Sequence, residues 1–385
     1  MRNKTLLVFS AVLMAIAVGC TKENASENLT FAGIEVEVGE QNGSSMLFIL
    51  NEGSFPGAST LDLLDFKTKK YYADVFGQTN PEVEQGMGNT GNDMALVDGR
   101  LWVLMNASNQ VVVLDMPSCK LNTSISIESP RHLDMDENYV YITSYGGAVY
   151  GGDPTEGKVY RVNRRTFAFD FLQVGYQPEG VSVVADKLFV ANSGGYNYTH
   201  DNRLTVIDLN QWKVLSQQEM PVTNLNEMKL AHGKLWMSSY GESTWTEATP
   251  GNWVQTVSAP MSLVSVPFTL AEAPTVVSGV HADKMTYCEP NLYIIGNDAE
   301  MTGGYDLCLY KVNTNTGTIT TTHFEGSDLS RVGYPYGLLV NPANGDIYVC
   351  DASFTGDSKV HCFNASFQWK WSVTTGIGTG HLLLR

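Results

Sequence analysis

Leu101-Trp102-Val103 and Leu188-Phe189-Val190 show the pattern that decides the fold: an aliphatic residue, an aromatic residue and a further apolar residue. Aromatic residues make up 10% of the chain, yet the middle position is aromatic in every copy, so the recurrence is not a chance result. β-Branched and aromatic residues favour buried strands. The copies are Leu47-Phe48-Ile49, Leu101-Trp102-Val103, Val140-Tyr141-Ile142, Leu188-Phe189-Val190, Leu235-Trp236-Met237, Leu292-Tyr293-Ile294 and Ile347-Tyr348-Val349.

Each copy has further predicted strands around it. A strand such as 204–208 follows and ends in Asp or Asn, which suits a tight turn. An outer strand such as 214–220 comes next, and an inner strand such as 181–184 precedes the pattern. Four strands repeated every 40 to 50 residues or so are typical of a propeller blade. The sequence therefore predicts an all-β chain whose residues 46–385 form one seven-bladed β-propeller.

The first predicted blade lacks an inner strand before Leu47. The last residues, His381 to Leu384, have the composition of that missing strand. We therefore expect the C-terminal strand to pair with blade one and close the propeller, which removes the open sheet edges that invite aggregation.

The N-terminus predicts export. Arg2 and Lys4 precede an apolar run too short to span a bilayer, and small residues lead up to Cys20. This arrangement resembles a bacterial lipobox, which implies a signal peptide at 1–19, lipidation of Cys20 and a polar tether over 20–45. The alternative is an ordinary signal peptide with an unrelated cysteine. Glu23 and Glu27 resemble the surface-export signals of Bacteroidetes lipoproteins, although Lys22 interrupts them; the expected location is the outer membrane, facing the cell exterior.

Charge and cysteine content narrow the partners. The formal charge of −16 becomes about −18 without residues 1–19, so a nucleic-acid partner is excluded by repulsion. An acidic surface is also repelled by anionic lipid, so the anchor must hold the protein at the membrane. The sequence has no CxxC pair, so it does not indicate a zinc site. Cys350 and Cys362 fall on neighbouring predicted strands, where a disulfide is possible, but buried thiols are preferred.

Long, dissimilar loops between the second and third strands of the blades predict the binding face. They cover 145–157, 193–202, 240–260 and 297–306. Aromatic side chains with polar tips provide contact area and hydrogen bonds at low entropic cost, although they can instead pack against neighbouring loops. Such residues in the loops are Tyr145, Tyr150, Tyr196, Tyr198, Tyr240, Trp245 and Trp253, together with Phe354.

A second candidate set lies at the mouth of the predicted channel. Alignment backwards from each pattern brings Asn92, Arg131, Glu179, Asn226 and Asp283 to the same place, and an insertion brings Tyr336 there. Buried polar groups need partners, so these side chains must meet water, each other or a ligand. Pairing of Arg131 with Glu179 is the alternative to ligand binding.

Several segments resemble the YncE-like propellers of Bacteroidetes, and most closely the BtuG-type corrinoid-capturing lipoproteins. They are 174–180, which includes Tyr176, 188–196, Leu50-Asn51-Glu52-Gly53, Gly91-Asn92-Asp93 and Tyr334-Pro335-Tyr336-Gly337. The resemblance implies a surface protein that binds cobalamin (vitamin B12) and passes it to a TonB-dependent outer-membrane transporter. The loop aromatics would then cover the corrin plane, and Arg131 would meet the phosphate of the nucleotide loop.

Two other classes remain open. Asn92, Glu179, Asn226 and Asp283 offer oxygen ligands for calcium, as in metal-dependent propeller lactonases, but Arg131 would place a positive charge beside the ion. The seven histidines are scattered and no GxSxG motif is present, so no serine hydrolase site is predicted. A structural or adhesive propeller without a ligand is the third possibility. We expect a binding protein that is not an enzyme and has no catalytic cofactor or metal.

Overall fold

The computed structural model describes residues 29–39, 45–54, 57–147, 156–195, 200–249, 251–298 and 306–385, without the side chains of Trp245 and Trp253. These residues form an all-β protein with a short helix, α1 (Val75–Thr79). Cys20, Tyr150, Tyr196 and Tyr198, which the sequence assigns to the anchor and the binding loops, lie outside the described residues.

The first sheet joins the two ends of the described chain. Its strand order is β1 (Ile34–Glu35), β4 (Lys70–Tyr72), β3 (Thr60–Asp65), β2 (Met46–Asn51) and β31 (Thr379–Leu384). β31 lies antiparallel to β2, with Leu383 opposite Phe48. The predicted pairing of the C-terminal strand with the first sheet is therefore confirmed.

Six further sheets have four antiparallel strands each. From the inner to the outer strand, three of them are β5 (Gly91–Val97), β6 (Arg100–Met105), β7 (Gln110–Asp115), β8 (Lys120–Ser126); β9 (Pro130–Met135), β10 (Tyr139–Ser144), β11 (Glu156–Asn163), β12 (Phe169–Tyr176); and β13 (Pro178–Val184), β14 (Lys187–Asn192), β15 (Arg203–Asp208), β16 (Lys213–Glu219). The others are β17 (Leu225–Ala231), β18 (Lys234–Ser239), β21 (Ser262–Pro267), β22 (Thr275–Val277); β23 (Ala282–Cys288), β24 (Asn291–Asn297), β25 (Leu307–Asn313), β26 (Ile319–His323); and β27 (Pro335–Val340), β28 (Ile347–Asp351), β29 (Ser358–Phe363), β30 (Trp369–Thr375).

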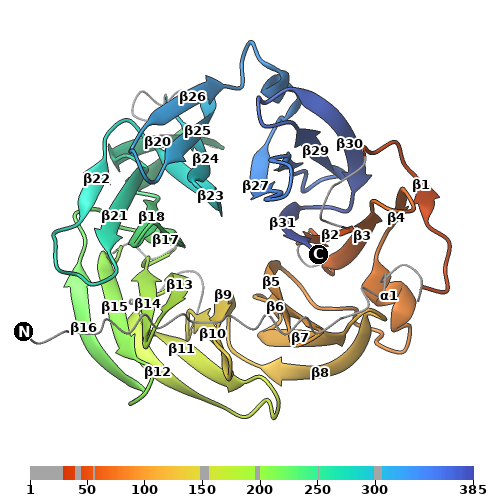
Figure 1. Cartoon of the computed structure of the whole chain (residues 1–385), viewed down its shortest axis with the longest axis horizontal. Coiled ribbons are helices and arrows are strands. Elements are labelled where there is room, and N and C mark those ends of the chain that lie inside the picture. The colour runs from red at the N-terminus through yellow and green to blue at the C-terminus, as the bar shows by residue number, and fades with distance from the viewer. Residues whose placement is uncertain are drawn as a thin grey trace, which may run out of the picture.

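The sheets are arranged around a central axis in a β-propeller-like fold (Figure 1). Each inner strand contacts the inner strands of adjacent sheets, in the order β31, β5, β9, β13, β17, β23, β27 and back to β31. The aromatic pattern of the sequence lies on the second strand of every sheet, from β2 to β28. Those strands are buried on both faces, which explains their continuous apolar character.

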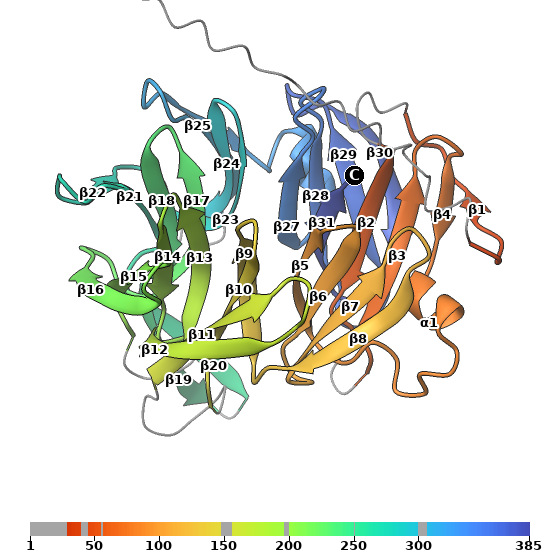
Figure 2. The same cartoon turned by 60° about the horizontal axis from the view of Figure 1, so that its bottom comes forward.

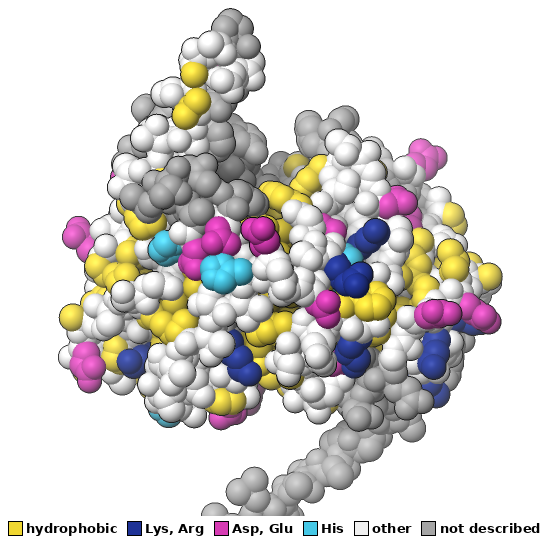
Figure 3. Space-filling view, turned by 90° about the horizontal axis from the view of Figure 1, so that it is seen from above, with side chains coloured by type: hydrophobic (Ala, Val, Ile, Leu, Met, Phe, Trp, Pro, Cys, Tyr) yellow, Lys and Arg dark blue, Asp and Glu magenta, His cyan; other side chains and the backbone are white. Residues whose placement is uncertain are grey.

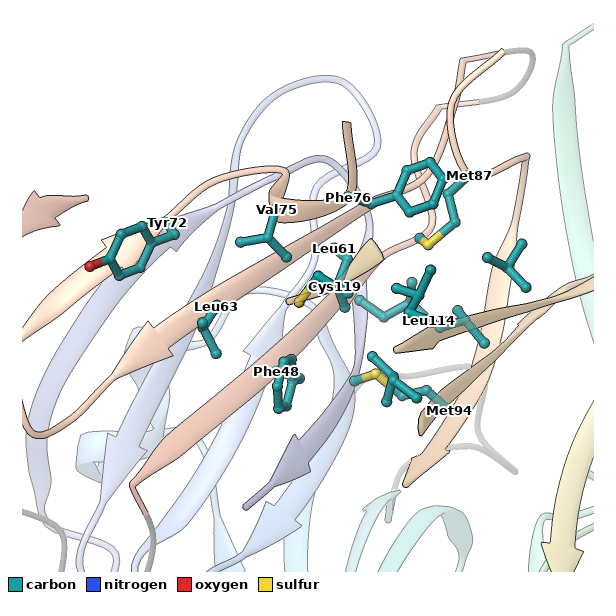
Figure 4. Close-up of a cluster of buried hydrophobic side chains, with 14 of the residues drawn as sticks. Phe48, Leu61, Leu63, Tyr72, Val75, Phe76, Met87, Met94, Leu114 and Cys119 are labelled. Atoms are coloured by element: carbon teal, nitrogen blue, oxygen red, sulfur yellow. The ribbon is translucent and has the colours of Figure 1, made fainter. Parts of the chain in front are cut away.

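The hydrophobic core is divided among the spaces between neighbouring sheets. The cluster in Figure 4 packs Phe48 and Leu63 of the first sheet against Leu114 of the next, and α1 covers it through Val75 and Phe76. Around the rim, seen from above in Figure 3, apolar side chains alternate with acidic, basic and polar ones. The inter-sheet clusters therefore hold the sheets together, and the loop ends of the strands are left to carry function.

The predicted tether is partly wrong. Residues 34–38 fall within the tether expected over 20–45, but β1 pairs with β4 and the Val38 side chain is buried in the first sheet's apolar cluster. The physical reason is that Val36 and Val38 pack on the apolar cluster of the first sheet, whereas Ile34 in β1 stays exposed.

The long loop predicted at 240–260 contains a hairpin of its own. β19 (Glu242–Thr249) and β20 (Asn252–Ala259) form a two-stranded sheet between β18 and β21, and Figure 2 shows it beyond the ends of the other strands. The five described cysteines are all free, which confirms the preference for thiols over a Cys350–Cys362 disulfide. Among the described residues, no helix is both long and apolar enough to cross a bilayer.

Candidate functional site

Every inner strand has a β-bulge close to its first residue, where its pairing with the second strand shifts register. Bulges change the direction of side chains and are frequent near functional sites. We call the first extra residue in each strand the bulge position. The bulge positions are Asn92, Arg131, Glu179, Asn226, Asp283, Tyr336 and Gly380. The first six are the residues that the sequence aligned, so this alignment is confirmed.

The bulge positions lie at the end of the sheets from which the long loops leave. Leu225, just before the bulge of β17, is opposite Ser239, after which the chain enters the β19–β20 hairpin. In five strands the residue two positions before the bulge has a positive φ, and four of these five are not glycine. They are Thr90, Ser129, Gln177, Asn224 and Gly378. This uncommon backbone conformation thus precedes Asn92, Arg131, Glu179 and Asn226, and we call the face on which the bulge positions lie the mouth.

Arg131 links the side chains of two neighbouring bulge positions. Its Nε and Nη2 atoms donate to the two carboxylate oxygens of Glu179 at 3.0 and 2.9 Å, and Nη1 donates to Asn92 Oδ1 at 2.6 Å. The Tyr145 ring centroid lies 4.7 Å from the guanidinium carbon, and the Tyr145 hydroxyl donates to Glu179. We call Asn92, Arg131, Tyr145 and Glu179 the Arg131 cluster. Bidentate charge-assisted pairs of this kind fix geometry strongly.

The charge on Glu179 is stabilised by its neighbours. Burial alone would raise the pKa of this carboxyl, but Arg131, His132 and the Tyr145 hydroxyl bring the pKa below its usual value. His132 Nε2 lies 3.5 Å from a Glu179 oxygen and its Nδ1 lies 3.2 Å from Asp93. The Arg131 cluster is therefore a compensated ion pair at neutral pH, as the alternative interpretation of the sequence expected.

Three other carboxylates near the axis connect inner strands to each other. Asp93 accepts from the backbone N–H of Leu133 at 3.3 Å, and Asp134 accepts from that of Val183 at 2.7 Å. Glu227 likewise accepts from the N–H of Met285 at 2.9 Å. Each bond joins one sheet to the next. These half-buried acidic groups therefore have a structural role.

Lys284 is the cation of the other half of the mouth. Its Nζ donates to the Tyr240 hydroxyl at 3.2 Å and lies 5.5 Å from the Tyr336 ring centroid. Burial alone would lower the pKa of Lys284, but Tyr240, Asp283 and Glu227 raise it well above its usual value. Among the described residues, no carboxylate forms an ion pair with it. Lys284 is thus a fixed positive charge held by aromatic rings.

Three aromatic rings form an exposed surface next to Lys284. Tyr334 stacks on Tyr336 with 5.9 Å between ring centroids, and Phe354 meets the Tyr336 ring edge-on at 5.4 Å. Tyr334 is 46% exposed and Phe354 39%. A Cβ at Gly380, the seventh bulge position, would lie 3.0 Å from the Tyr336 ring, so glycine there leaves room for this ring. We call Tyr334, Tyr336 and Phe354 the aromatic platform.

Two bulge positions between these groups have polar atoms without a hydrogen-bond partner among the described residues. They are Nδ2 of Asn226, whose residue is 3% exposed, and Oδ1 of Asp283. Burial raises the pKa of Asp283, which Lys284 opposes and Glu227 reinforces. Leaving a buried polar group unpaired costs about 1–3 kcal/mol, so these atoms mark an incomplete part of the site.

The remaining predicted residues are dispersed. Tyr176 is the last residue of the outer strand β12, and its ring centroid lies 4.9 Å from the Arg203 guanidinium carbon. Tyr145 is 1% exposed, and its buried ring packs against the Arg131 guanidinium. The backbone of Trp245 lies in β19, opposite Gln255. The sequence missed Lys284 and Tyr334 as site residues, although they adjoin Asp283 and the Pro335-Tyr336 segment that it had selected.

A cavity of about 620 Å³ lies between β1, β3, β4 and β30. Asp62 in its wall already accepts bonds from Tyr71, Asn51 and the N–H of Asp74 at 2.5–2.8 Å, so this carboxylate is satisfied internally. In the described parts of the chain, no three His, Cys, Asp or Glu side chains come together as a metal site.

Comparisons with known proteins identify the family and support the fold. The family model described as "Domain of unknown function (DUF5074)" matches residues 45–367. No curated protein matches the sequence. Similar solved structures include a hydrazine synthase of Kuenenia stuttgartiensis (13% identity, covering 75% of this chain and 87% of that one, TM-score 0.56), AztD of Citrobacter koseri (11%, 88% and 97%, 0.53) and a hypothetical selenium-binding protein of Sulfolobus tokodaii (11%, 89% and 93%, 0.55). Identities this low bear on the fold alone.

Proposed function

The chain belongs to the DUF5074 family, and from the geometry of the mouth we propose that it is a seven-bladed β-propeller lipoprotein that binds a corrinoid and passes it to a TonB-dependent outer-membrane transporter. The blade count is supported by the inner strands, whose contacts run from β31 through β27 and return to β31. It is also supported by the bulge that each of these strands has at the same place.

The observation that carries the ligand proposal is the open half of the mouth. The aromatic platform is exposed beside Lys284, and next to it Asn226 Nδ2 and Asp283 Oδ1 have no hydrogen-bond partner among the described residues. A corrin ring offers an apolar plane edged by amide groups, which suits aromatic faces bordered by hydrogen-bonding groups. The resemblance of segments such as Tyr334-Pro335-Tyr336-Gly337 to BtuG-type proteins points to the same ligand.

Within this proposal the Arg131 cluster fixes the geometry of one half of the mouth. The phosphate contact expected for Arg131 stays a prediction, but Glu179 already engages two of its nitrogen atoms and Asn92 a third. A ligand phosphate would have to compete with a carboxylate for the guanidinium. The contribution of Tyr196, Tyr198, Tyr240 and Trp245 to the ligand contact also stays a prediction.

Binding is favoured over metal-dependent lactone hydrolysis. A calcium ion coordinated by Asn92 and Glu179 would have to displace Arg131 from the oxygens that it now contacts. Such a displacement would leave a buried guanidinium next to a divalent cation, which is strongly unfavourable. We therefore propose a protein that holds its ligand without turnover.

Replacing Phe354 with alanine tests the ligand and the place of binding together. The full-length chain, purified in detergent, is expected to bind cyanocobalamin in a titration followed by calorimetry. Phe354→Ala is expected to weaken binding about thirtyfold, because loss of a central aromatic anchor typically costs ~2 kcal/mol. Trp369→Ala is the matched control: Trp369 is also 39% exposed but lies on the outer strand β30, so affinity should not change. Absence of heat at micromolar wild-type protein would contradict the corrinoid proposal.

Cys20→Ala tests the proposed anchor. Wild-type protein is expected in the membrane fraction and to incorporate labelled palmitate, because diacylglycerol on Cys20 would hold an acidic body at the bilayer. The variant is expected to be unlabelled and either soluble or uncleaved. Protease treatment of intact cells measures display on the exterior. Recovery of the alanine variant in the membrane at the wild-type level would refute the anchor.

Delivery to a transporter follows from an anchored propeller that has no route of its own across the membrane. The β19–β20 hairpin lies beyond the other strands on the side of the mouth, as Figure 2 shows, so it is placed to contact a partner around the bound ligand.

A further inference from the structure

The side chains at neighbouring bulge positions are joined in one half of the mouth and separate in the other. On β5, β9 and β13, Arg131 connects Asn92 to Glu179 through bonds of 2.6–3.0 Å. On β17 and β23, the equivalent residues Asn226 and Asp283 form no hydrogen bond with each other, although their strands are in contact. The second half therefore lacks the bridging group that Arg131 provides in the first.

The atoms facing this gap define the chemistry of the missing group. Asn226 Nδ2 is a hydrogen-bond donor without a partner in the described structure, and Asp283 Oδ1 is an acceptor without one. Lys284 adds a second donor, its Nζ, which is bonded to the Tyr240 hydroxyl and forms no ion pair with a described carboxylate. A complementary group must accept from Asn226 or Lys284 and donate to Asp283.

We propose that Asn226, Asp283 and Lys284 form a subsite for a primary carboxamide group, whose oxygen accepts from Asn226 and Lys284 while its N–H donates to Asp283. This inference deepens the proposed function, since it names the ligand group that this part of the mouth recognises. The primary amide is a neutral group that carries an acceptor oxygen and two N–H donors on the same carbon. The aromatic platform lies next to Lys284 and would cover the apolar body that carries the amide.

Other small groups satisfy only part of the subsite. A carboxylate or phosphate offers acceptors alone and would place a negative charge beside Asp283 and Glu227. An ammonium offers donors alone and would face Lys284. Asn226 Nδ2 and Asp283 Oδ1 are both shielded from solvent, so binding requires rotations of these two side chains, which are common changes at binding sites.

Three benzene derivatives test the subsite independently of any corrinoid. Benzamide carries the primary amide, benzoate replaces it with an anion, and N,N-dimethylbenzamide keeps the oxygen but has no N–H. The full-length protein, labelled with nitrogen-15, is titrated with each while the side-chain amide resonance of Asn226 is followed, identified by its loss in Asn226→Asp. Benzamide is expected to shift this resonance saturably, and the other two to bind at least tenfold more weakly, because a site built for hydrogen bonding rejects analogues that leave its groups unpaired.

Two substitutions complete the test. Asn226→Asp exchanges the donor for an acceptor and is expected to weaken benzamide binding at least tenfold. Asn315→Asp, in an exposed turn, is the matched control and should leave binding unchanged. If Asn226→Asp does not fold, Asp283→Asn replaces it as the test variant. The Asn226 side-chain resonance of the wild type still reports whether benzamide binds selectively. Equal shifts with all three compounds, or an Asn226 resonance that none of them moves, would overturn the inference.

Cyanocobalamin, titrated into the same samples, separates the two proposals. Specific benzamide binding without cyanocobalamin binding supports the carboxamide subsite and contradicts the corrinoid function. If cyanocobalamin binds equally well to the wild type and to Asn226→Asp, and benzamide binds no better than the other two compounds, the result contradicts the carboxamide subsite and supports the corrinoid function.

Discussion

Deletion of residues 379–385 is expected to prevent cooperative folding. These residues include all of β31, the inner strand of the first sheet, which pairs with β2 along its length. Leu382 and Leu384 pack against the cluster between the first and last sheets, and Leu383 packs against the cluster on the other side of the first sheet. Each leucine contributes up to ~2 kcal/mol, and a domain of this kind has only about 5–15 kcal/mol of net stability.

The truncation also removes polar contacts that close the first sheet. The Thr379 hydroxyl donates to Asn51, and the backbone N–H groups of Ser45 and Met46 donate to Arg385 O at 2.8 and 3.2 Å. Without β31 the buried strand β2 becomes an exposed apolar edge, which promotes aggregation.

Urea unfolding followed by circular dichroism, together with size-exclusion chromatography, measures this effect. The truncated chain is expected to elute as aggregate and to show no sharp transition. His381→Ala is the control, because it removes the one ionisable side chain of β31 and leaves the strand in place. A monomeric truncated protein with the wild-type midpoint would show that β31 is dispensable.

The sequence predicted the parts of the fold that depend on local pattern. An aromatic residue between aliphatic ones requires a strand buried on both faces, and Trp102, Phe189 and Tyr348 are all at most 1% exposed on second strands. The missing inner strand before Leu47 was also predictable, because a four-stranded repeat leaves a place for β31. The β19–β20 hairpin was not, since its polar and apolar residues gave no signal distinct from a loop.

The candidate site was predictable in position and less so in role. Counting residues back from the pattern found six bulge positions, because the bulge recurs at one place in each repeat. The roles depend on contacts between different sheets, which no local pattern encodes. Thus Arg131 proves to be engaged by Glu179, Asp93 bonds the backbone of the next sheet, and Lys284 donates to the Tyr240 hydroxyl.

Arg131→Met is expected to destabilise the protein by about 3–5 kcal/mol near neutral pH. The substitution keeps the length and apolar packing of the side chain over Tyr145 but leaves Glu179, which is 4% exposed, as a buried charge without its main partner. Removing one partner of a buried pair is costly for this reason. Arg131→Met/Glu179→Gln is expected to regain most of the loss, because the remaining amide carries no charge and can still bond the Tyr145 hydroxyl.

The dependence of stability on pH gives this prediction its clearest signature. In the wild type the folded pKa of Glu179 is below its unfolded value, since Arg131, His132 and Tyr145 outweigh burial. Its contribution is therefore complete above the unfolded pKa, about 4.3 for Glu, and is lost as the pH falls through the folded pKa. In Arg131→Met burial is expected to dominate and raise the folded pKa. The sign then reverses, and the free energy of unfolding should fall as the pH rises above about 4.3.

Urea denaturation at several pH values from 4 to 9 compares the wild type, Arg131→Met and the double variant. The difference between the wild type and Arg131→Met should widen as the pH rises, because Glu179 then loses its proton in the single variant without a cation to stabilise it. The double variant should show no such widening, since Gln does not titrate. A loss in Arg131→Met that is constant over this range, and equal in the double variant, would mean that Arg131 stabilises the mouth through packing and that its pairing with Glu179 has no net electrostatic effect.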